Sequence, residues 1–139
     1  FLVDCEGNII EGRPLGVVGA HVKDHNTGNV GVSLLGHYHP PYNHAVTPAQ
    51  RDAVLAIGRW LRDSHAVAPA LFQGHRDFGA GTDCPGDIVA ADVPAWRDAM
   101  RDAVVRAALR LRLLIFAITT ALIFWLDLHL LGALLDSQS

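Results

Sequence analysis

Short apolar runs separated by turn residues characterise the strand-forming parts of the chain. Residues 1–11 contain two such runs on either side of Asp4-Cys5-Glu6-Gly7-Asn8, a pattern that predicts a β-hairpin. The apolar segment at residues 30–35 is followed by glycine and predicts a second, buried strand. Residues 70–72, Ala-Leu-Phe, predict a further brief strand.

Two segments instead carry the apolar spacing of helices. Thr47-Pro48-Ala49-Gln50 combines an N-cap residue, proline at the first helical position and the glutamine of a capping box. A helix is therefore predicted from Pro48 to Ser64, with an apolar stripe at Val54, Leu55, Ile57 and Leu61. A second helix is predicted to begin at Asp92 or Pro94 and to continue through Trp96, Met100, Val104 and Leu109. Together these elements predict an α/β fold in which helices flank a small mixed sheet.

The C-terminal tail has a different composition. Residues 113–126 contain no charge, and with the leucines that follow the apolar stretch over 113–135 is long enough to span a bilayer. Asp127 and His129 interrupt it, and charges within a span are costly. We therefore divide the chain into a domain at 1–110 and a tail at 111–139. A helix packed on the domain, membrane association and a non-native tail all remain open for that tail.

Composition excludes some classes of partner. The formal net charge is -3, and a phosphate-binding surface needs an excess of basic residues, so a nucleic-acid partner is not expected. The chain contains two cysteines, Cys5 and Cys84, too few for the disulfide framework of a small secreted protein. The cysteine count therefore leaves the redox compartment open.

One glycine-rich segment contains two potential metal ligands. His75 and Cys84 lie nine positions apart in the sequence, and a neutral imidazole and a thiolate are both good ligands for zinc. Two ligands do not complete a catalytic site, which usually takes three protein ligands and a water molecule. From this chemistry alone, a free cysteine and an unrelated loop histidine remain the alternative.

The order of motifs resembles a known family. Gly74-His-Arg-Asp77 followed by Thr82-Asp-Cys-Pro-Gly-Asp87 is similar to the zinc loop of N-acetylmuramoyl-L-alanine amidases. This family includes amidase-type phage lysozymes, bacterial autolysins and animal peptidoglycan recognition proteins. The resemblance covers residues 1 to about 110 and includes further colinear segments at 1–4, 7–13, 18–21, 29–36 and 47–50.

The resemblance implies a function and a set of site residues. His75 and Cys84 match zinc ligands, so the implied cofactor is Zn²⁺, and the catalytic Thr82 matches a position that stabilises charge on the amide oxygen. His21 and Asn26 match positions that line the groove for the stem peptide, although a structural role for His21 remains open. The implied reaction is zinc-dependent hydrolysis of the amide between N-acetylmuramic acid and L-alanine, with peptidoglycan as the partner.

Two departures from the family pattern affect the expected activity. The segment Gly79-Ala80-Gly81 contains one residue more than the family usually has between the zinc histidine and cysteine. The family's first zinc ligand and a catalytic tyrosine would fall before Phe1, so we expect a truncated chain with weak or absent hydrolysis. The alternative is a non-catalytic module that binds muramyl peptide. For localisation, we expect the protein to act at the cell wall or outside the cell. If it is a phage endolysin, it would be released from the host cytoplasm.

Other polar residues near these motifs favour ordinary roles. His37, His39 and His44 are expected to be exposed, solvated loop histidines. Arg76 and Asp77 are expected to form an ion pair that orders the loop, or Asp77 to bond a ligand histidine.

Overall fold

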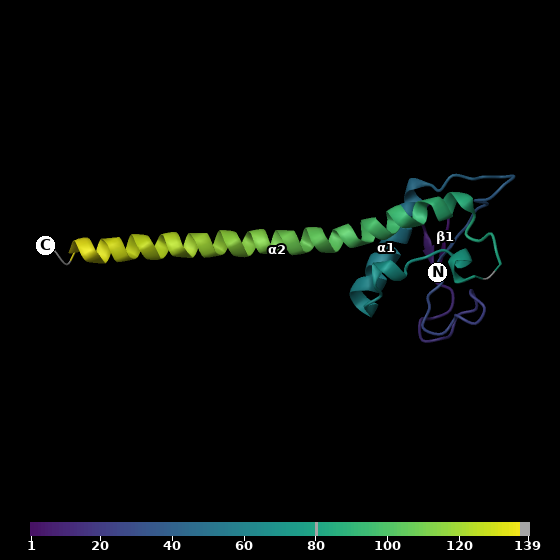
Figure 1. Ribbon diagram of the computed structural model, residues 1–139, viewed down its shortest axis with the longest axis horizontal. Helices are drawn as coiled ribbons and strands as arrows, with labels where there is room; N and C mark the ends of the chain where they lie inside the picture. Colours follow the sequence, from purple (N-terminus) through teal and green to yellow (C-terminus); the bar gives the residue numbers. More distant parts are fainter. Residues whose placement is uncertain (80, 137–139) are drawn as a thin grey trace. The chain divides into compact units, whose positions relative to one another are not determined.

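The protein is described by a computed structural model that covers the backbone of residues 1–79 and 81–136. Side chains are described for residues 1–79, 81–101, 111–120 and 122. The chain divides into two compact units, Phe1–Arg101 and Asp102–Ser139 (Figure 1). The sheet and the candidate site residues all belong to the first unit.

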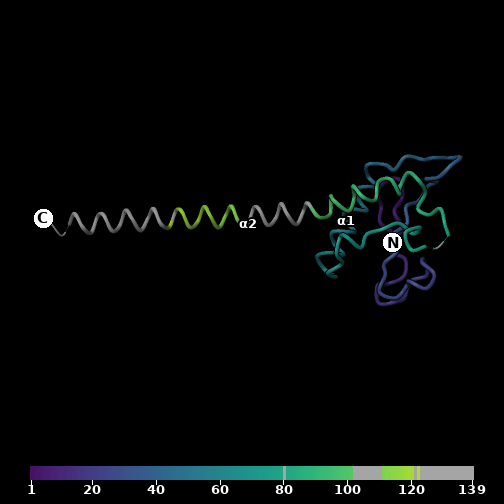
Figure 2. The backbone as a smooth tube through the Cα atoms, viewed as in Figure 1, coloured from purple at the N-terminus to yellow at the C-terminus, as the bar shows by residue number. Residues whose placement is uncertain are grey.

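A three-stranded mixed sheet lies at the centre of the first unit. Strands β1 (Leu2–Val3), β2 (Ile9–Ile10) and β3 (Ser33–Leu34) have the order β2-β1-β3. The β1–β2 pair is antiparallel and the β1–β3 pair is parallel, with Val3 opposite both Ile9 and Leu34. The mixed sheet and both strand-forming regions, 1–11 and 30–35, are therefore confirmed, although the regular strands are shorter than predicted. Between β2 and β3 the backbone follows an irregular path (Figure 2).

The hairpin turn is fixed by a carboxylate and by the neighbouring helix. Asp4 Oδ1 accepts hydrogen bonds from the backbone N–H groups of Glu6 at 3.1 Å and Asn8 at 2.8 Å. Gly7 has a φ of +84°, and a Cβ atom there would lie 2.8 Å from the Ala49 carbonyl oxygen. Only glycine therefore suits this turn, in which left-handed backbone packs against the first turn of the next helix.

Helix α1 (Pro48–His65) begins where the sequence predicts it. The Thr47 side chain accepts a hydrogen bond from Gln50 N at 3.0 Å, and Gln50 Oε1 accepts one from Thr47 N at 3.2 Å. The capping box thus satisfies two of the N–H groups that every helix start leaves unpaired. The predicted apolar stripe is buried and faces the core, at Val54, Leu55, Ile57 and Leu61.

Helix α2 (Asp87–Asp136) begins earlier than predicted. The expected start at Asp92 or Pro94 is wrong, because the first helical hydrogen bond runs from Ala90 N to Gly86 O at 2.9 Å. Pro94 lies inside the helix. Because proline has no backbone N–H, the one hydrogen bond lost is the bond that residue 94 would otherwise donate to the carbonyl of residue 90. The buried stripe shows why the helix starts early, since it already includes Val89 and Val93 before it reaches Trp96 and Met100.

The predicted strand at residues 70–72 is also wrong. Pro69–Leu71 form a 3₁₀ turn, η1, in which Leu71 N bonds Ala68 O at 2.9 Å and Phe72 N bonds Pro69 O at 3.1 Å. Pro69 starts this turn without an N–H of its own to satisfy. Leu71 is 66% exposed, so the apolar run there is no sign of a buried strand.

A buried glutamine connects the sheet to helix α1. Gln50 is 1% exposed, and its Nε2 donates to Leu35 O at 3.2 Å and to Tyr38 Oη at 2.8 Å. The Tyr38 hydroxyl in turn donates to Leu35 O at 3.1 Å. Every polar atom of this small network has a partner, which is the condition under which a buried amide is tolerated.

In the second unit the backbone of α2 continues to Asp136, and the described side chains at 111–120 and 122 are exposed. Within the part of the chain that the structure describes, no helix combines the length and apolar character needed to cross a membrane. Most side chains of 121–135, on which the packing and membrane hypotheses partly rest, lie outside the described residues.

The buried network makes a testable prediction about stability. Gln50→Leu should lower the free energy of unfolding by about 2–3 kcal/mol, because Thr47 N loses its acceptor, and Leu35 O and the Tyr38 hydroxyl oxygen each lose the donor that Gln50 supplies. Tyr38→Phe should lower it by about 1 kcal/mol, and the double variant by less than the sum of the two. Urea unfolding of all four proteins measures this coupling. Strict additivity of the two losses in unfolding free energy would contradict the shared hydrogen bond. The control is Arg51→Ala, because Arg51 is exposed and immediately follows Gln50 in the sequence.

Candidate functional site

The candidate site is built on a short helical turn that follows the motif Gly74-His-Arg-Asp77. This turn is η2 (His75–Phe78), in which Gly74 N donates to Asp77 Oδ2 at 2.8 Å. Gly79 ends it with a φ of +70° and donates its N–H to Arg76 O at 3.1 Å. Asp77 therefore stabilises the start of its own turn, and the expected Arg76–Asp77 ion pair is wrong.

The second half of the loop returns to the beginning of η2. Arg76 N donates to Cys84 O at 2.9 Å, so the backbone next to His75 is bonded directly to the backbone of Cys84. A Cβ atom at Gly74 would lie 3.0 Å from Pro85 Cδ, which leaves little room between the two segments. His75 is half-buried, whereas Cys84 is exposed and its thiol is free. The fold thus brings the two predicted metal ligands into neighbouring backbone segments.

Thr82 lies within this loop and is half-buried. Its Oγ1 accepts a hydrogen bond from Cys84 N at 3.1 Å. Since the hydroxyl acts as the acceptor in that bond, its own proton is available for another partner. The catalytic role predicted for Thr82 requires such a donor.

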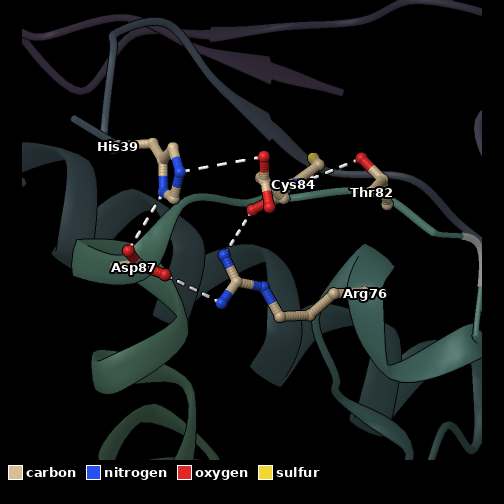
Figure 3. A network of polar contacts seen from close by, with 6 residues as sticks. His39, Arg76, Thr82, Cys84 and Asp87 are labelled. Carbon is tan, nitrogen blue, oxygen red and sulfur yellow. Dashed lines mark hydrogen bonds and ion pairs between the residues drawn. The ribbon is translucent and has the colours of Figure 1, made fainter. Parts of the chain in front are cut away.

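A network of charged side chains surrounds Cys84 (Figure 3). Arg76 Nη1 lies 2.9 Å from Asp87 Oδ1, and Arg76 Nη2 donates to the Asp83 carbonyl oxygen. His39 Nδ1 lies 3.1 Å from Asp87 Oδ2, and His39 Nε2 lies 3.7 Å from Asp83 Oδ2. The ion-pair partner of Arg76 is thus Asp87, at the start of α2. These contacts connect the loop to α2 and to the segment that carries His39.

These contacts change the acidity of Asp87. The hydrogen bond from Arg76 lowers the pKa of the Asp87 carboxyl below its ordinary value, desolvation opposes this in part, and His39 lowers it further. The carboxylate also lies in the first turn of α2, where the helix dipole favours negative charge. Asp87 is therefore held in its charged form.

His39 departs from the expectation that it is a solvated loop histidine. Its side chain is 39% exposed and contacts two carboxylates, so that expectation is wrong for this residue. His37 and His44 are exposed as predicted, and their rings are 5.8 Å apart. No local sequence pattern indicates the position of His39, because the contact joins segments far apart along the chain.

The predicted groove residues His21 and Asn26 lie in one tight loop. Asn26 Oδ1 accepts hydrogen bonds from the backbone N–H groups of both His21 and Val22, each at 2.8 Å. The His21 ring fits between two glycines, because a Cβ atom would lie 2.5 Å from its Nδ1 at Gly19 and 2.7 Å from its Cγ at Gly31. His21 Nε2 is buried and has no hydrogen-bond partner among the residues that the structure describes. The Asn26 oxygen thus holds the backbone of the loop, while the Nε2 atom of His21 lacks a hydrogen-bond partner among the described residues.

An aromatic contact joins this loop to the candidate metal loop. The rings of His25 and Phe78 lie 5.4 Å apart, and Phe78 is the last residue of η2. The contact places the 21–26 loop next to the turn that carries His75. Sequence reasoning missed His25, which lies between the two groove residues that the resemblance identified.

The donor set fits part of a zinc site. Imidazole and thiolate are the ligand types that zinc prefers, and the Arg76–Cys84 backbone bond holds their segments together. Among the residues that the structure describes, no group of three or more His, Cys, Asp or Glu side chains could hold a metal ion. His75 and Cys84 therefore remain a two-ligand prediction.

Comparison with known proteins establishes the family. The family model described as N-acetylmuramoyl-L-alanine amidase matches residues 1–87. Peptidoglycan-recognition protein SC2 of Drosophila melanogaster is 33% identical over 100 residues, which cover 69% of this chain and 50% of that protein. The N-acetylmuramoyl-L-alanine amidase of Sus scrofa is 35% identical over 102 residues, which cover 69% of this chain and 16% of that protein. The chain belongs to the N-acetylmuramoyl-L-alanine amidase family, and the predicted family and α/β fold are confirmed.

The extent of these matches differs between relatives. The chain spans about half the length of the Drosophila peptidoglycan-recognition proteins that it matches. An uncharacterized protein of Haemophilus influenzae is 35% identical over 104 residues, which cover 67% of this chain and 88% of that protein. No solved structure matches the chain.

The charged network predicts a pH dependence of stability. Because the folded pKa of Asp87 is lowered, its stabilising contribution is present above the unfolded pKa and is lost as the pH falls through the folded value. Asp87→Asn should therefore destabilise the protein near neutral pH, and the difference from the parent should shrink below about pH 4.

Thermal unfolding at several pH values measures this difference. Asp98→Asn, which removes an exposed carboxylate of the same helix outside the network, is the matched control. A difference between Asp87→Asn and the parent that stays constant down to acidic pH would contradict the assignment.

Proposed function

We propose that this chain carries the zinc loop of an enzyme that hydrolyses the amide between N-acetylmuramic acid and L-alanine in peptidoglycan. The observation that carries the proposal is the backbone bond from Arg76 N to Cys84 O, which brings the segments of His75 and Cys84 together. Membership of the amidase family supports the same reaction. The proposed zinc ligands are His75 and Cys84.

The chain's own residues have distinct tasks in this proposal. A zinc ion bound by His75 and Cys84 would supply Lewis acidity and acidify a water molecule. The Thr82 hydroxyl donates a hydrogen bond to the oxygen of the scissile amide as negative charge develops there. This role is supported by the Thr82 geometry, in which Cys84 N occupies an acceptor position of the hydroxyl oxygen and leaves its proton available.

The loop at residues 21–26 provides the side of the groove that receives the stem peptide. His21 Nε2 is a buried polar atom with no partner in the described part of the chain, so a peptide N–H or C=O is a suitable partner for it. Asn26 acts indirectly, since its oxygen holds the backbone of His21. The substrate is a wall polymer, so the proposed site of action is the cell wall.

Zinc content tests the proposal most simply. Titrated with zinc, the purified chain should bind about one equivalent, with a lower affinity than a complete three- or four-ligand site because only two protein ligands are proposed. His75→Ala and Cys84→Ser should each lose it, because each removes a ligand. Elemental analysis measures the content, and Cys5→Ser, which changes the other free cysteine, should retain the metal.

The opposite result would point to the alternative function. A parent chain that holds no zinc yet binds a soluble muramyl peptide in calorimetry would be a peptidoglycan-binding module without catalysis. In that case His21→Ala should weaken peptide binding, while Cys84→Ser should leave it unchanged.

A further inference from the structure

His39 reaches the candidate zinc loop from a distant part of the sequence (Figure 3). Its two ring nitrogens contact different carboxylates, with Nδ1 at 3.1 Å from Asp87 and Nε2 at 3.7 Å from Asp83. Asp83 immediately precedes Cys84, and Asp87 follows it by three positions. One imidazole therefore lies within ion-pair distance of carboxylates on both sides of the proposed sulfur ligand, although its Nδ1 makes no hydrogen bond to a described residue.

The segment that carries His39 is itself firmly anchored. Tyr38 is 6% exposed and is held by Gln50, while its carbonyl oxygen accepts a hydrogen bond from Ile88 N at 3.2 Å. Gly86 has a φ of +89°, and a Cβ atom there would lie 2.5 Å from the Tyr38 carbonyl oxygen. The backbone before His39 thus packs directly against the backbone after Cys84, so His39 has a fixed position from which to hold the loop.

The loop needs such an external contact. Gly79 and Gly81 both have left-handed backbone, with φ of +70° and +59°, and apart from chain neighbours no atom of the described residues lies within 4 Å of a Cβ built at either position. Glycine loses more conformational freedom on ordering than any other residue. Arg76 contacts the Asp83 carbonyl oxygen and the Asp87 carboxylate from η2, which precedes these glycines in the loop. The His39 side chain and the Tyr38 carbonyl oxygen contact this part of the chain from the core side.

We propose that His39 is a positioning residue for Cys84, which fixes the thiolate for metal binding through Asp83 and Asp87. This inference rests on the proposed function, because it assumes that Cys84 is a zinc ligand. It does not make His39 a ligand, since both of its nitrogens already face carboxylates. Residues that orient a ligand in this way commonly affect metal affinity by about 10- to 100-fold.

Cadmium binding to Cys84 tests the role of His39. In a Cys5→Ser parent, Cys84 is the only thiol, and the ultraviolet cadmium–thiolate absorption band reports metal bound to that sulfur. The variants are His39→Ala, His39→Gln and the matched control His44→Ala, which removes an exposed histidine of the same loop. Each protein is titrated with Cd²⁺ at neutral pH, and its thermal midpoint is measured without metal.

His39→Ala should weaken cadmium binding at least about 10-fold with little change in the thermal midpoint. His39→Gln keeps a donor for one carboxylate and should recover part of the loss, and it serves alone if His39→Ala does not fold. His44→Ala should bind as the parent does. A purely structural role for His39 would lower the midpoint and leave the affinity of the folded protein unchanged.

The possible failures are distinguishable. If the parent shows the band and both His39 variants bind cadmium as tightly as the parent, the positioning role is refuted and the zinc site stands. If the parent itself shows no band, the proposed zinc site is refuted and the role of His39 falls with it.

Discussion

The hydrogen bonds between Gln50, Tyr38 and Leu35 O are the constraint on which the rest of the first unit depends. They join the first turn of α1 to the end of β3, and they do so with a glutamine that is almost fully buried. A buried amide stabilises a fold only when its polar atoms are paired, so this network fixes one arrangement of these segments. Gly36 contributes by its lack of a side chain, since a Cβ there would lie 2.5 Å from the Tyr38 hydroxyl oxygen.

The same tyrosine connects the core to the candidate site. Its side chain belongs to the buried network, whereas its carbonyl oxygen receives the N–H of Ile88 at the start of α2. The loop that carries Cys84 must therefore close against residue 38, and His39 follows on that support. The proposed zinc loop, which is exposed at Cys84 and rich in glycine, gains precision when it is fastened to a rigid part of the fold.

Local signals predicted the parts of this structure that depend on neighbours in sequence. The capping box at Thr47 and Gln50 and the turn around Gly7 both form as expected. Pro94 was misleading, because proline is common at helix starts, whereas here the buried stripe of α2 already begins before it, at Val89. His39 could not be predicted, since its importance arises only when the fold brings residue 39 to Asp83 and Asp87. The motif around His75 and Cys84 indicated the family but not the partners of Arg76.

The central claim is that His75 and Cys84 bind one zinc ion. X-ray absorption spectroscopy of the zinc-loaded chain tests it directly, because sulfur and nitrogen ligands differ in distance and scattering. The account predicts one sulfur at about 2.3 Å and nitrogen or oxygen ligands at about 2.0–2.1 Å, with the sulfur lost in Cys84→Ser and retained in Cys5→Ser. A first shell without sulfur in the parent chain would contradict the account.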